Sequence, residues 1–239
     1  MQLTKPPAIS LSVVVMAYNE EDSLPLLLEE LVPYLESHTR LSDWEVVVVD
    51  DGSSDGTAEV VEEWAQREAG VRLFRHPHNM GMGAAIRTGY TQARCDFVTQ
   101  LPADLQVPPE IFNLFLPHIP EFDIVLSVYE NRGEGFTRRF LAAGYRAVAR
   151  LLLGQRADYT GTMMFRRELA DRIAITTNTF VANLEFPLAA LDLDAKMQLV
   201  TFTPSPRRAG ESKVANSRRI LFVFKELLAL RRRRASKQA

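Results

Sequence analysis

Short apolar runs alternate with stretches of helical spacing along the first half of the chain. Four runs are rich in Val, Leu or Phe and give way to polar residues; they are residues 11–16, 46–49, 71–74 and 97–101. Between them, apolar side chains recur three and four residues apart in residues 24–34, around residues 60–64 and in residues 81–93. This spacing is typical of one face of a helix. The pattern therefore predicts strands and helices in regular alternation.

The alternation of strand and helix predicts the fold class. Strands that are apolar on both faces belong to covered sheets, and a helix between successive strands makes them parallel. We expect an α/β fold, a three-layer sandwich around a mostly parallel sheet. In the less regular second half, strands are predicted at residues 124–128, 162–165 and 197–202, and helices at residues 111–116, 138–153 and 184–191.

Acidic residues follow two of the predicted strands. Asp50 and Asp51 lead directly into Gly52, and Asp104 has Gln106 two residues further on. Ligands of parallel α/β sheets bind beyond the carboxyl ends of the strands, and a glycine lets a ligand come close to the backbone. Carboxylate and amide oxygens suit Mg²⁺ or Mn²⁺. Taken singly, each cluster is equally well explained as a turn or a helix cap.

Four motifs in a fixed order remove this ambiguity. They are AYNEE at residues 17–21, VDDGSSDGT at 49–57, NMGMGAA at 79–85 and ADLQVPPE at 103–110. In this order they resemble glycosyltransferase family 2, and within it the polyprenol-phosphate (dolichol-phosphate) mannosyl- and glucosyltransferases. The resemblance covers about the first 110 residues and resumes at Arg207 and residues 210–213. It implies a Rossmann-like GT-A-type fold and an inverting transfer from a nucleotide-diphosphate sugar such as GDP-mannose or UDP-glucose.

The resemblance also implies roles for individual residues. The residues that match nucleotide-binding positions are Ala17, Tyr18, Glu20, Asp50, Asp51 and Gly81. Among them, Asp51 matches the acid that reads the base or ribose. Arg207, Ser212 and Lys213 match the basic segment that closes over the pyrophosphate or the acceptor phosphate. Asp104 matches the last acid of the family's Asp-x-Asp metal motif and Gln106 the amide that follows it, so both are expected to bind Mg²⁺ or Mn²⁺.

One departure from the family concerns the metal. Pro102 stands where the family has the first Asp of the metal motif, and proline supplies no ligand. Either Asp104 and Gln106 suffice together with the diphosphate, or the protein is a weakened or non-catalytic nucleotide-sugar-binding relative. We expect an active enzyme, because the acid that coordinates most directly is retained.

The acceptor depends on whether a general base is present. Family members that act on a sugar hydroxyl carry such a base, often within a Glu-Asp pair. Glu185 occupies this place but is followed by Phe186 and Pro187. A lipid phosphate is already an anionic nucleophile, so the sequence favours a polyprenyl phosphate, with Arg139 matched to the acceptor phosphate. The alternatives are transfer to a saccharide or metabolite hydroxyl with Glu185 as base, or a helix-surface role for Glu185.

The charge is divided unevenly along the chain. From Arg207 onward, eleven Lys and Arg oppose two Glu, a local balance of +9 that leaves −11 on the rest. An apolar stripe in residues 220–230 lies between arginines, as in helices at a membrane interface, although packing on the core or oligomerisation explains it equally well. We expect a GT-A domain in residues 1–215 and an amphipathic basic helix in residues 216–239, in peripheral contact with the cytoplasmic face of a membrane. Nucleic-acid binding is not expected, because no recognition motif accompanies the basic residues.

The remaining features add little chemistry. A signal peptide and a membrane-spanning run are not expected, because the chain lacks an apolar stretch of the required length. The single cysteine, Cys95, cannot form an internal disulfide and favours a reducing compartment. His76 and His78 flank a proline and are expected on a surface loop without a role. The motifs leave the base and the sugar open.

Overall fold

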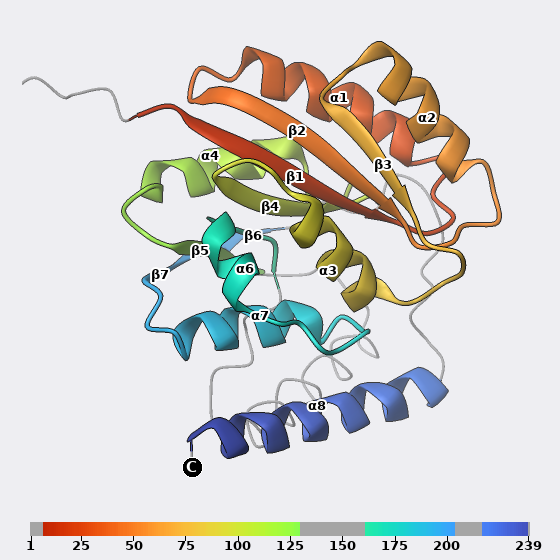
Figure 1. Ribbon diagram of the computed structural model, residues 1–239. Coiled ribbons are helices and arrows are strands. Elements are labelled where there is room, and N and C mark those ends of the chain that lie inside the picture. Colours follow the sequence, from red (N-terminus) through yellow and green to blue (C-terminus); the bar gives the residue numbers. More distant parts are fainter. Residues whose placement is uncertain (1–6, 130–160, 204–216, 239) are drawn as a thin grey trace, which may run out of the picture.

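A seven-stranded mixed sheet forms the centre of the protein (Figure 1). The computed structural model describes residues 7–129, 161–203 and 217–238. The strands lie in the order β3-β2-β1-β4-β6-β5-β7. Their bounds are β1 Ile9–Ala17, β2 Leu41–Asp50, β3 Val71–Arg75, β4 Phe97–Pro102, β5 Ile124–Tyr129, β6 Met163–Arg166 and β7 Met197–Phe202. The predicted α/β class with a mostly parallel sheet is confirmed.

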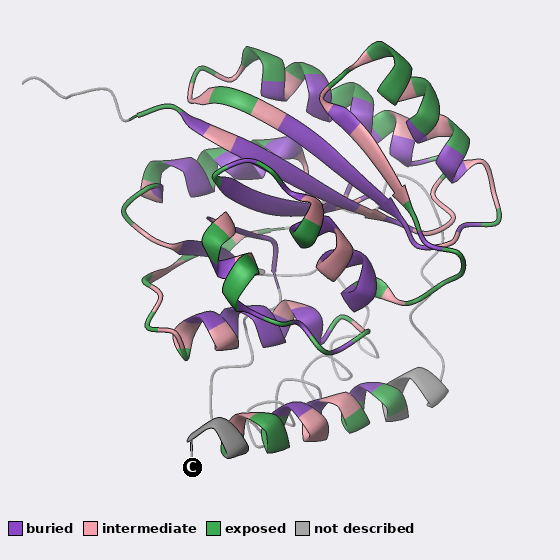
Figure 2. Ribbon diagram, viewed as in Figure 1, coloured by how far each residue is buried: buried purple, intermediate pink, exposed green. Residues whose placement is uncertain are grey.

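The central strands are buried on both faces, as their apolar sequence predicts (Figure 2). Side chains of a strand alternate between its two faces. Val13 and Val15 of β1 belong to one hydrophobic core, while Val14 between them belongs to a second core on the opposite face. All three are completely shielded from solvent. Two cores on a single sheet require helices on both sides.

The sheet changes direction beyond β4. β1 pairs in parallel with β2 and β4, and β2 pairs in parallel with β3. β6 lies antiparallel between β4 and β5, whereas β5 and β7 are parallel to each other. The three parallel neighbours β2, β1 and β4 are the part of the sheet that carries the sequence motifs.

Helices cover both faces of the sheet (Figure 1). Their bounds are α1 Leu24–Ser37, α2 Thr57–Arg67, α3 Met82–Gln92, α4 Phe112–Phe115, α6 Arg167–Arg172, α7 Ala182–Leu191 and α8 Ser217–Gln238. α1, α2 and α4 lie on one face, and α3, α6 and α7 on the other. The helix expected at residues 111–116 is divided into η1 Pro109–Ile111, α4 and η2 Leu116–His118. The helix expected at residues 138–153 lies outside the described residues.

The C-terminal helix α8 lies beside α7 (Figure 1), and Arg233 and Arg234 of α8 form ion pairs with Glu185 of α7 and with Asp192 at its end. Its side chains Val223, Leu227 and Leu230 are buried, whereas Phe222 and Phe224 are 49% and 41% exposed. The predicted apolar stripe is thus divided between an inner and an outer surface. Among the residues that the structure describes, no helix combines the length and the apolar character needed to cross a bilayer. The division of the chain into residues 1–215 and 216–239 stays a prediction.

Candidate active site

Three neighbouring parallel strands end at one edge of the sheet with the predicted site residues. Met16 of β1 lies opposite Val49 of β2 and opposite Pro102 of β4, so all three strands stop at the same level. Neighbouring strands are about 4.8 Å apart, and the loops that follow β2 and β4 therefore begin roughly 10 Å apart. The structure brings Asp51 and Asp104 to the same edge.

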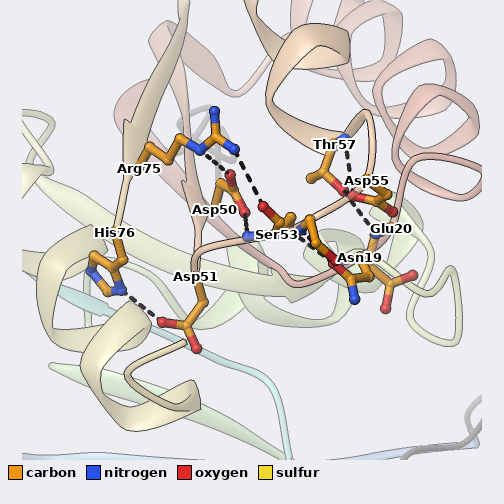
Figure 3. A network of polar contacts seen from close by, with 10 residues as sticks. Asn19, Glu20, Asp50, Asp51, Ser53, Asp55, Thr57, Arg75 and His76 are labelled. Atoms are coloured by element: carbon orange, nitrogen blue, oxygen red, sulfur yellow. Dashed lines mark hydrogen bonds and ion pairs between the residues drawn. The ribbon is translucent and has the colours of Figure 1, made fainter. Parts of the chain in front are cut away.

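The loops after β1 and β2 are joined by hydrogen bonds (Figure 3). The N–H of Asn19 donates to Ser53 Oγ, and Asn19 Oδ1 accepts the N–H of Ser54, both at 2.9 Å. The N–H of Glu20 donates to Thr57 Oγ1 at 2.9 Å. Asn19 has a φ of 54°, a left-handed conformation that asparagine tolerates better than most residues. The two loops therefore form one unit.

Two acidic side chains of this unit, Glu20 and Asp55, accept hydrogen bonds from residues of the same unit or of the helix that follows it. Ser23 Oγ donates to Glu20 Oε2 at 2.5 Å, so the predicted nucleotide ligand Glu20 holds the start of α1. Asp55 Oδ1 accepts the N–H of Thr57 at 3.1 Å. Desolvation raises the pKa of Asp55, but hydrogen bonds from the Thr57 side chain and from backbone N–H groups together lower this pKa below its usual value. Tyr18, between the strand and this unit, is half-buried.

Asp50 supports the loop from inside. Its carboxylate is completely buried, and Oδ1 accepts the N–H of Ser53 at 2.9 Å. Arg75 Nε lies 3.1 Å from Oδ2, an ion pair without the alignment of a hydrogen bond. Arg75 also donates to the Ser53 carbonyl at 3.2 Å. These contacts give Asp50 a structural role that requires no ligand. Direct contact of Asp50 with a nucleotide stays a prediction.

Asp51 is surrounded by hydrogen-bond donors. Oδ1 accepts the N–H of Met80 at 2.9 Å and lies 2.7 Å from His76 Nδ1. Oδ2 accepts the N–H of Gly81 at 2.8 Å. Gly81 caps the N-terminus of α3, an end of a helix that favours negative charge. The carboxylate of Asp51 thereby fixes the NMGMGAA motif against the end of β2.

Two glycines let these segments approach one another. A Cβ on Gly52 would lie 2.3 Å from the His78 carbonyl carbon, and one on Gly81 would lie 2.3 Å from the Asn178 carbonyl oxygen. Their φ angles of 72° and 95° also exclude most side chains. The sequence assigns Gly52 to the approach of a ligand, but the structure shows that the backbone at His78 occupies that space. A hollow of about 320 Å³ remains beside it, lined by Gly52, Ser53, Arg75, His76 and Pro77.

The candidate metal ligands follow β4. Asp104 is only 7% exposed, and its Oδ1 accepts the N–H of Gln106 at 3.2 Å. Leu105 between them is buried with a φ of 57°, which costs a non-glycine residue about 1–2 kcal/mol. Such a strained conformation persists only where the surrounding structure enforces it, and it is often found at functional sites. Within the described ranges, no group of three or more metal-binding side chains is present.

Glu185 is buried and fully engaged rather than on the helix surface. Its Oε2 accepts the N–H groups of Thr176 and Thr177 at 3.1 and 2.9 Å and the Thr177 hydroxyl at 2.8 Å. Its Oε1 accepts the Thr176 hydroxyl at 2.5 Å. Arg233 Nη2 lies 3.9 Å from Oε1. These contacts give Glu185 a structural role, and its action as a base stays a prediction.

The segment of residues 175–179, which Glu185 holds, connects α8 to the site. Glu226 of α8 accepts the N–H groups of Asn178 and Thr179 at 2.7 and 3.2 Å. On its other side, the Asn178 carbonyl accepts the N–H of Gly83 at 3.0 Å. Arg87 of α3 donates to Asn178 Oδ1 at 3.2 Å. The position of α8 is thus coupled to the start of α3, where Asp51 is bound.

Four predicted site residues lie outside the described residues: Arg139, Arg207, Ser212 and Lys213. Conversely, the motifs gave no role to Arg75, Glu226 and His76. The prediction for His76 was wrong about its surroundings, because the ring is buried between β3 and α3. One signal in the sequence could have indicated a buried position for His76: it comes just after a predicted strand, as Asp51 does after β2. Nothing in the local sequence marked Glu226, whose partners lie 47 and 48 residues away.

Comparison with known proteins finds relatives among sugar transferases. A dolichyl-phosphate beta-glucosyltransferase of Trichomonas vaginalis is 49% identical over 102 residues, which are 41% of this chain and 31% of the relative. An undecaprenyl-phosphate 4-deoxy-4-formamido-L-arabinose transferase of Klebsiella pneumoniae is 29% identical over 226 residues, which are 93% of this chain and 68% of the relative. The chain therefore spans about one third to two thirds of the length of these curated relatives.

Solved structures show the same fold. Glucosyl-3-phosphoglycerate synthase from Mycobacterium tuberculosis, in complex with Mn²⁺, UDP-glucose and phosphoglyceric acid, superposes with a TM-score of 0.68 at 20% identity. The superposition covers 93% of this chain and 80% of the other, and it identifies the GT-A-type fold expected from the sequence. Residues 12–174 match the family described as "Glycosyl transferase family 2". With more than half of its residues in this match, the chain belongs to glycosyl transferase family 2.

Proposed function

We propose that this chain carries the nucleotide-sugar-binding core of an inverting glycosyltransferase that acts on a polyprenyl phosphate. The observation that carries the proposal is the convergence of Asp51, Asp104 and the loop at residues 17–21 on one edge of β2, β1 and β4. Ligands of parallel sheets bind at this edge. The names of the two relatives, a dolichyl-phosphate glucosyltransferase and an undecaprenyl-phosphate sugar transferase, support the lipid phosphate as acceptor.

In the proposed reaction, a phosphate oxygen of the lipid attacks the anomeric carbon of the sugar. The bond between this carbon and the nucleotide diphosphate breaks as the new bond forms on the opposite face. The nucleoside diphosphate leaves with the electron pair, and the configuration is inverted. Because the acceptor is already anionic, no side chain has to remove a proton from it. The main task of the protein is to stabilise the charge that develops on the leaving diphosphate.

Asp104 and Gln106 would hold the divalent cation. Their oxygens are hard ligands of the kind that Mg²⁺ and Mn²⁺ prefer, and the loop that carries them is held in place by the structure that enforces the strained conformation of Leu105. A bound cation would neutralise charge on the diphosphate. With Pro102 at the first position of the motif, most of the remaining ligands have to come from the diphosphate and water. Metal affinity should therefore depend strongly on the nucleotide.

The contacts of Glu185 support the phosphate acceptor over a hydroxyl acceptor. A general base must reach the proton that it removes. Glu185 is only 4% exposed, and its carboxylate accepts four hydrogen bonds from Thr176 and Thr177. An acid so engaged has little capacity left for a substrate proton.

Ligand-dependent thermal stability tests the proposal. UDP, GDP, UDP-glucose and GDP-mannose would be added to the full chain with and without Mn²⁺. A ligand at 100 times its Kd stabilises the folded state by about 2.7 kcal/mol. We expect at least one of these nucleotides to raise the melting temperature, with a larger effect in Mn²⁺.

Two variants and a matched control locate the binding. Asp51→Asn and Asp104→Asn should abolish the stabilisation by nucleotide. Asp96→Asn should leave it unchanged, because Asp96 precedes the same strand β4 at the opposite edge of the sheet. If no nucleotide stabilises the wild-type chain, the proposal is refuted. If nucleotide stabilises both Asp variants as it does the wild type, the nucleotide binds somewhere other than at Asp51 and Asp104.

A non-catalytic nucleotide-sugar-binding role is the second candidate, and Pro102 is the observation that favours it. The two functions differ in turnover rather than in binding. Incubation of a bound nucleotide sugar with a short polyprenyl phosphate should release nucleoside diphosphate if the first function is correct. Stable binding without release would support the second.

We also propose that α8 contacts an anionic membrane surface from the cytoplasmic side. The exposed rings of Phe222 and Phe224 and the exposed side chains of Arg231, Arg232 and Arg233 fit such a surface. Each basic residue near an anionic surface contributes about 1 kcal/mol. The chain should sediment with vesicles that contain phosphatidylglycerol and not with purely zwitterionic ones.

Replacement of both Phe222 and Phe224 by Ser should reduce this binding. Leu26→Ser serves as the matched control, because Leu26 is 44% exposed on α1. Equal binding of all variants to anionic vesicles would contradict the assignment to α8. The oligomeric state is a separate question that sedimentation equilibrium would answer.

A further inference from the structure

A buried histidine joins the third parallel strand to α3 beside the proposed nucleotide site. His76 follows β3 directly and is 9% exposed. Its Nδ1 lies 2.7 Å from Asp51 Oδ1, a contact drawn as a dashed line in Figure 3, and its Nε2 lies 2.9 Å from Thr88 Oγ1. Both ring nitrogens therefore have a partner, and one of the partners is the acid proposed to read the nucleotide.

The acceptor capacity of Asp51 shows what this contact does. A carboxylate oxygen offers about two lone pairs. On Oδ1, one lies toward His76 Nδ1 and the other accepts the N–H of Met80. On Oδ2, one accepts the N–H of Gly81. With one described donor on Oδ2 against two on Oδ1, the position best placed to accept a nucleotide N–H or O–H is on Oδ2.

The orientation of the carboxylate decides where that position points. Backbone N–H groups of Met80 and Gly81 donate to the carboxylate from the start of α3, and His76 contacts it from the residue that follows β3. Thr88 fixes the imidazole in turn, because its hydroxyl can donate to Nε2 while Nδ1 carries the proton shared with Asp51. Without the ring, Oδ1 would have an unused lone pair, and the carboxylate could turn away from the nucleotide.

We propose that His76 is a positioning residue for nucleotide recognition, acting through Asp51 and itself oriented by Thr88. This inference rests on the proposed function, because it assumes that Asp51 contacts the nucleotide. It predicts that the hydrogen bond at Nδ1, rather than the volume of the ring, sets the affinity. The measurement is the Kd of UDP or GDP, whichever binds the wild-type chain, by calorimetry in Mn²⁺.

Paired variants separate the hydrogen bond from packing. His76→Leu fills the space of the imidazole ring with an apolar side chain and removes both polar contacts. His76→Asn, by contrast, retains an N–H donor near the position of Nδ1. A hydrogen bond to a charged group contributes enough for about a tenfold to hundredfold weakening of nucleotide binding in His76→Leu, with recovery to within about fivefold in His76→Asn. Thr88→Val should weaken binding and Thr88→Ser should preserve it. His78→Ala, at an exposed position two residues away, should match the wild type.

Two results would overturn the proposal. One is wild-type affinity in a folded His76→Leu variant; the other is a loss in His76→Asn as large as in His76→Leu, which would assign the ring to packing. If His76→Leu does not fold, unchanged affinity in Thr88→Val would have the same meaning. Failure of the proposed function looks different, because the wild-type chain would then bind no nucleoside diphosphate at all.

Discussion

Replacement of Glu185 separates a catalytic base from a structural acid. The wild-type carboxylate accepts three donors on Oε2 and one on Oε1. In Glu185→Gln, the amide oxygen can take the three donors at Oε2, and the amide nitrogen can donate to the Thr176 hydroxyl after this hydroxyl rotates. The variant thus loses charge but keeps the contacts. In Glu185→Ala, by contrast, all four contacts disappear and the N–H of the buried Thr177 loses its acceptor.

The magnitudes of the two changes differ. A hydrogen bond to a charged group contributes about 1–1.5 kcal/mol more than one to a neutral group. Glu185→Gln weakens four such bonds, but burying a neutral amide also costs less than burying a carboxylate. Because these effects oppose each other, the net cost of Glu185→Gln should be only about 1–2 kcal/mol. Loss of a buried acid with its whole set of partners should cost about 3–5 kcal/mol in Glu185→Ala. At about 2–4 °C per kcal/mol for a chain of this size, the melting temperature should fall by only a few degrees in the first variant and by about 10 °C in the second.

The assay combines thermal unfolding with release of nucleoside diphosphate from the nucleotide sugar that binds. For a structural acid, turnover of Glu185→Gln should stay within about threefold of the wild type, far from the 10²–10⁴-fold loss expected for a general base. The reasoning would be refuted by a variant of nearly wild-type stability and nucleotide affinity whose turnover has fallen by such a factor. That outcome would favour transfer to a hydroxyl acceptor with Glu185 as the general base.

Further predictions follow from packing, charge and metal binding. Gly89→Ala should destabilise the fold by about 1–3 kcal/mol in chemical denaturation, because its Cβ would lie 2.1 Å from Val14 Cγ1; wild-type stability would contradict this. Glu226→Ala should lower the unfolding free energy by about 2–3 kcal/mol, while Lys225→Ala, at an exposed position beside it, should change it by less than about 0.5 kcal/mol. Pro102→Asp should tighten Mn²⁺ binding in the presence of nucleoside diphosphate, measured by calorimetry, and unchanged affinity would place the metal elsewhere.

The local sequence was sufficient for the fold class and for the positions of the main acids. Val13 to Val15 are apolar without interruption, which is typical of a strand covered on both faces, and the structure buries all three. Asp51 and Asp104 follow such strands, and parallel strands place their ends at one edge whatever the details of packing. These properties depend on neighbouring residues, so they can be read from a single chain.

Tertiary structure alone decided the direction of β6 and the partners of the polar side chains. A short apolar strand carries no mark of direction, and β6 is antiparallel because of where the chain returns to β4 and β5. Asp51 became the anchor of His76, Met80 and Gly81 through contacts 25 to 30 residues apart in sequence. Glu226 meets Asn178 across 48 residues. Such pairings arise from the packing of whole elements, and composition or spacing around one residue contains no information about them.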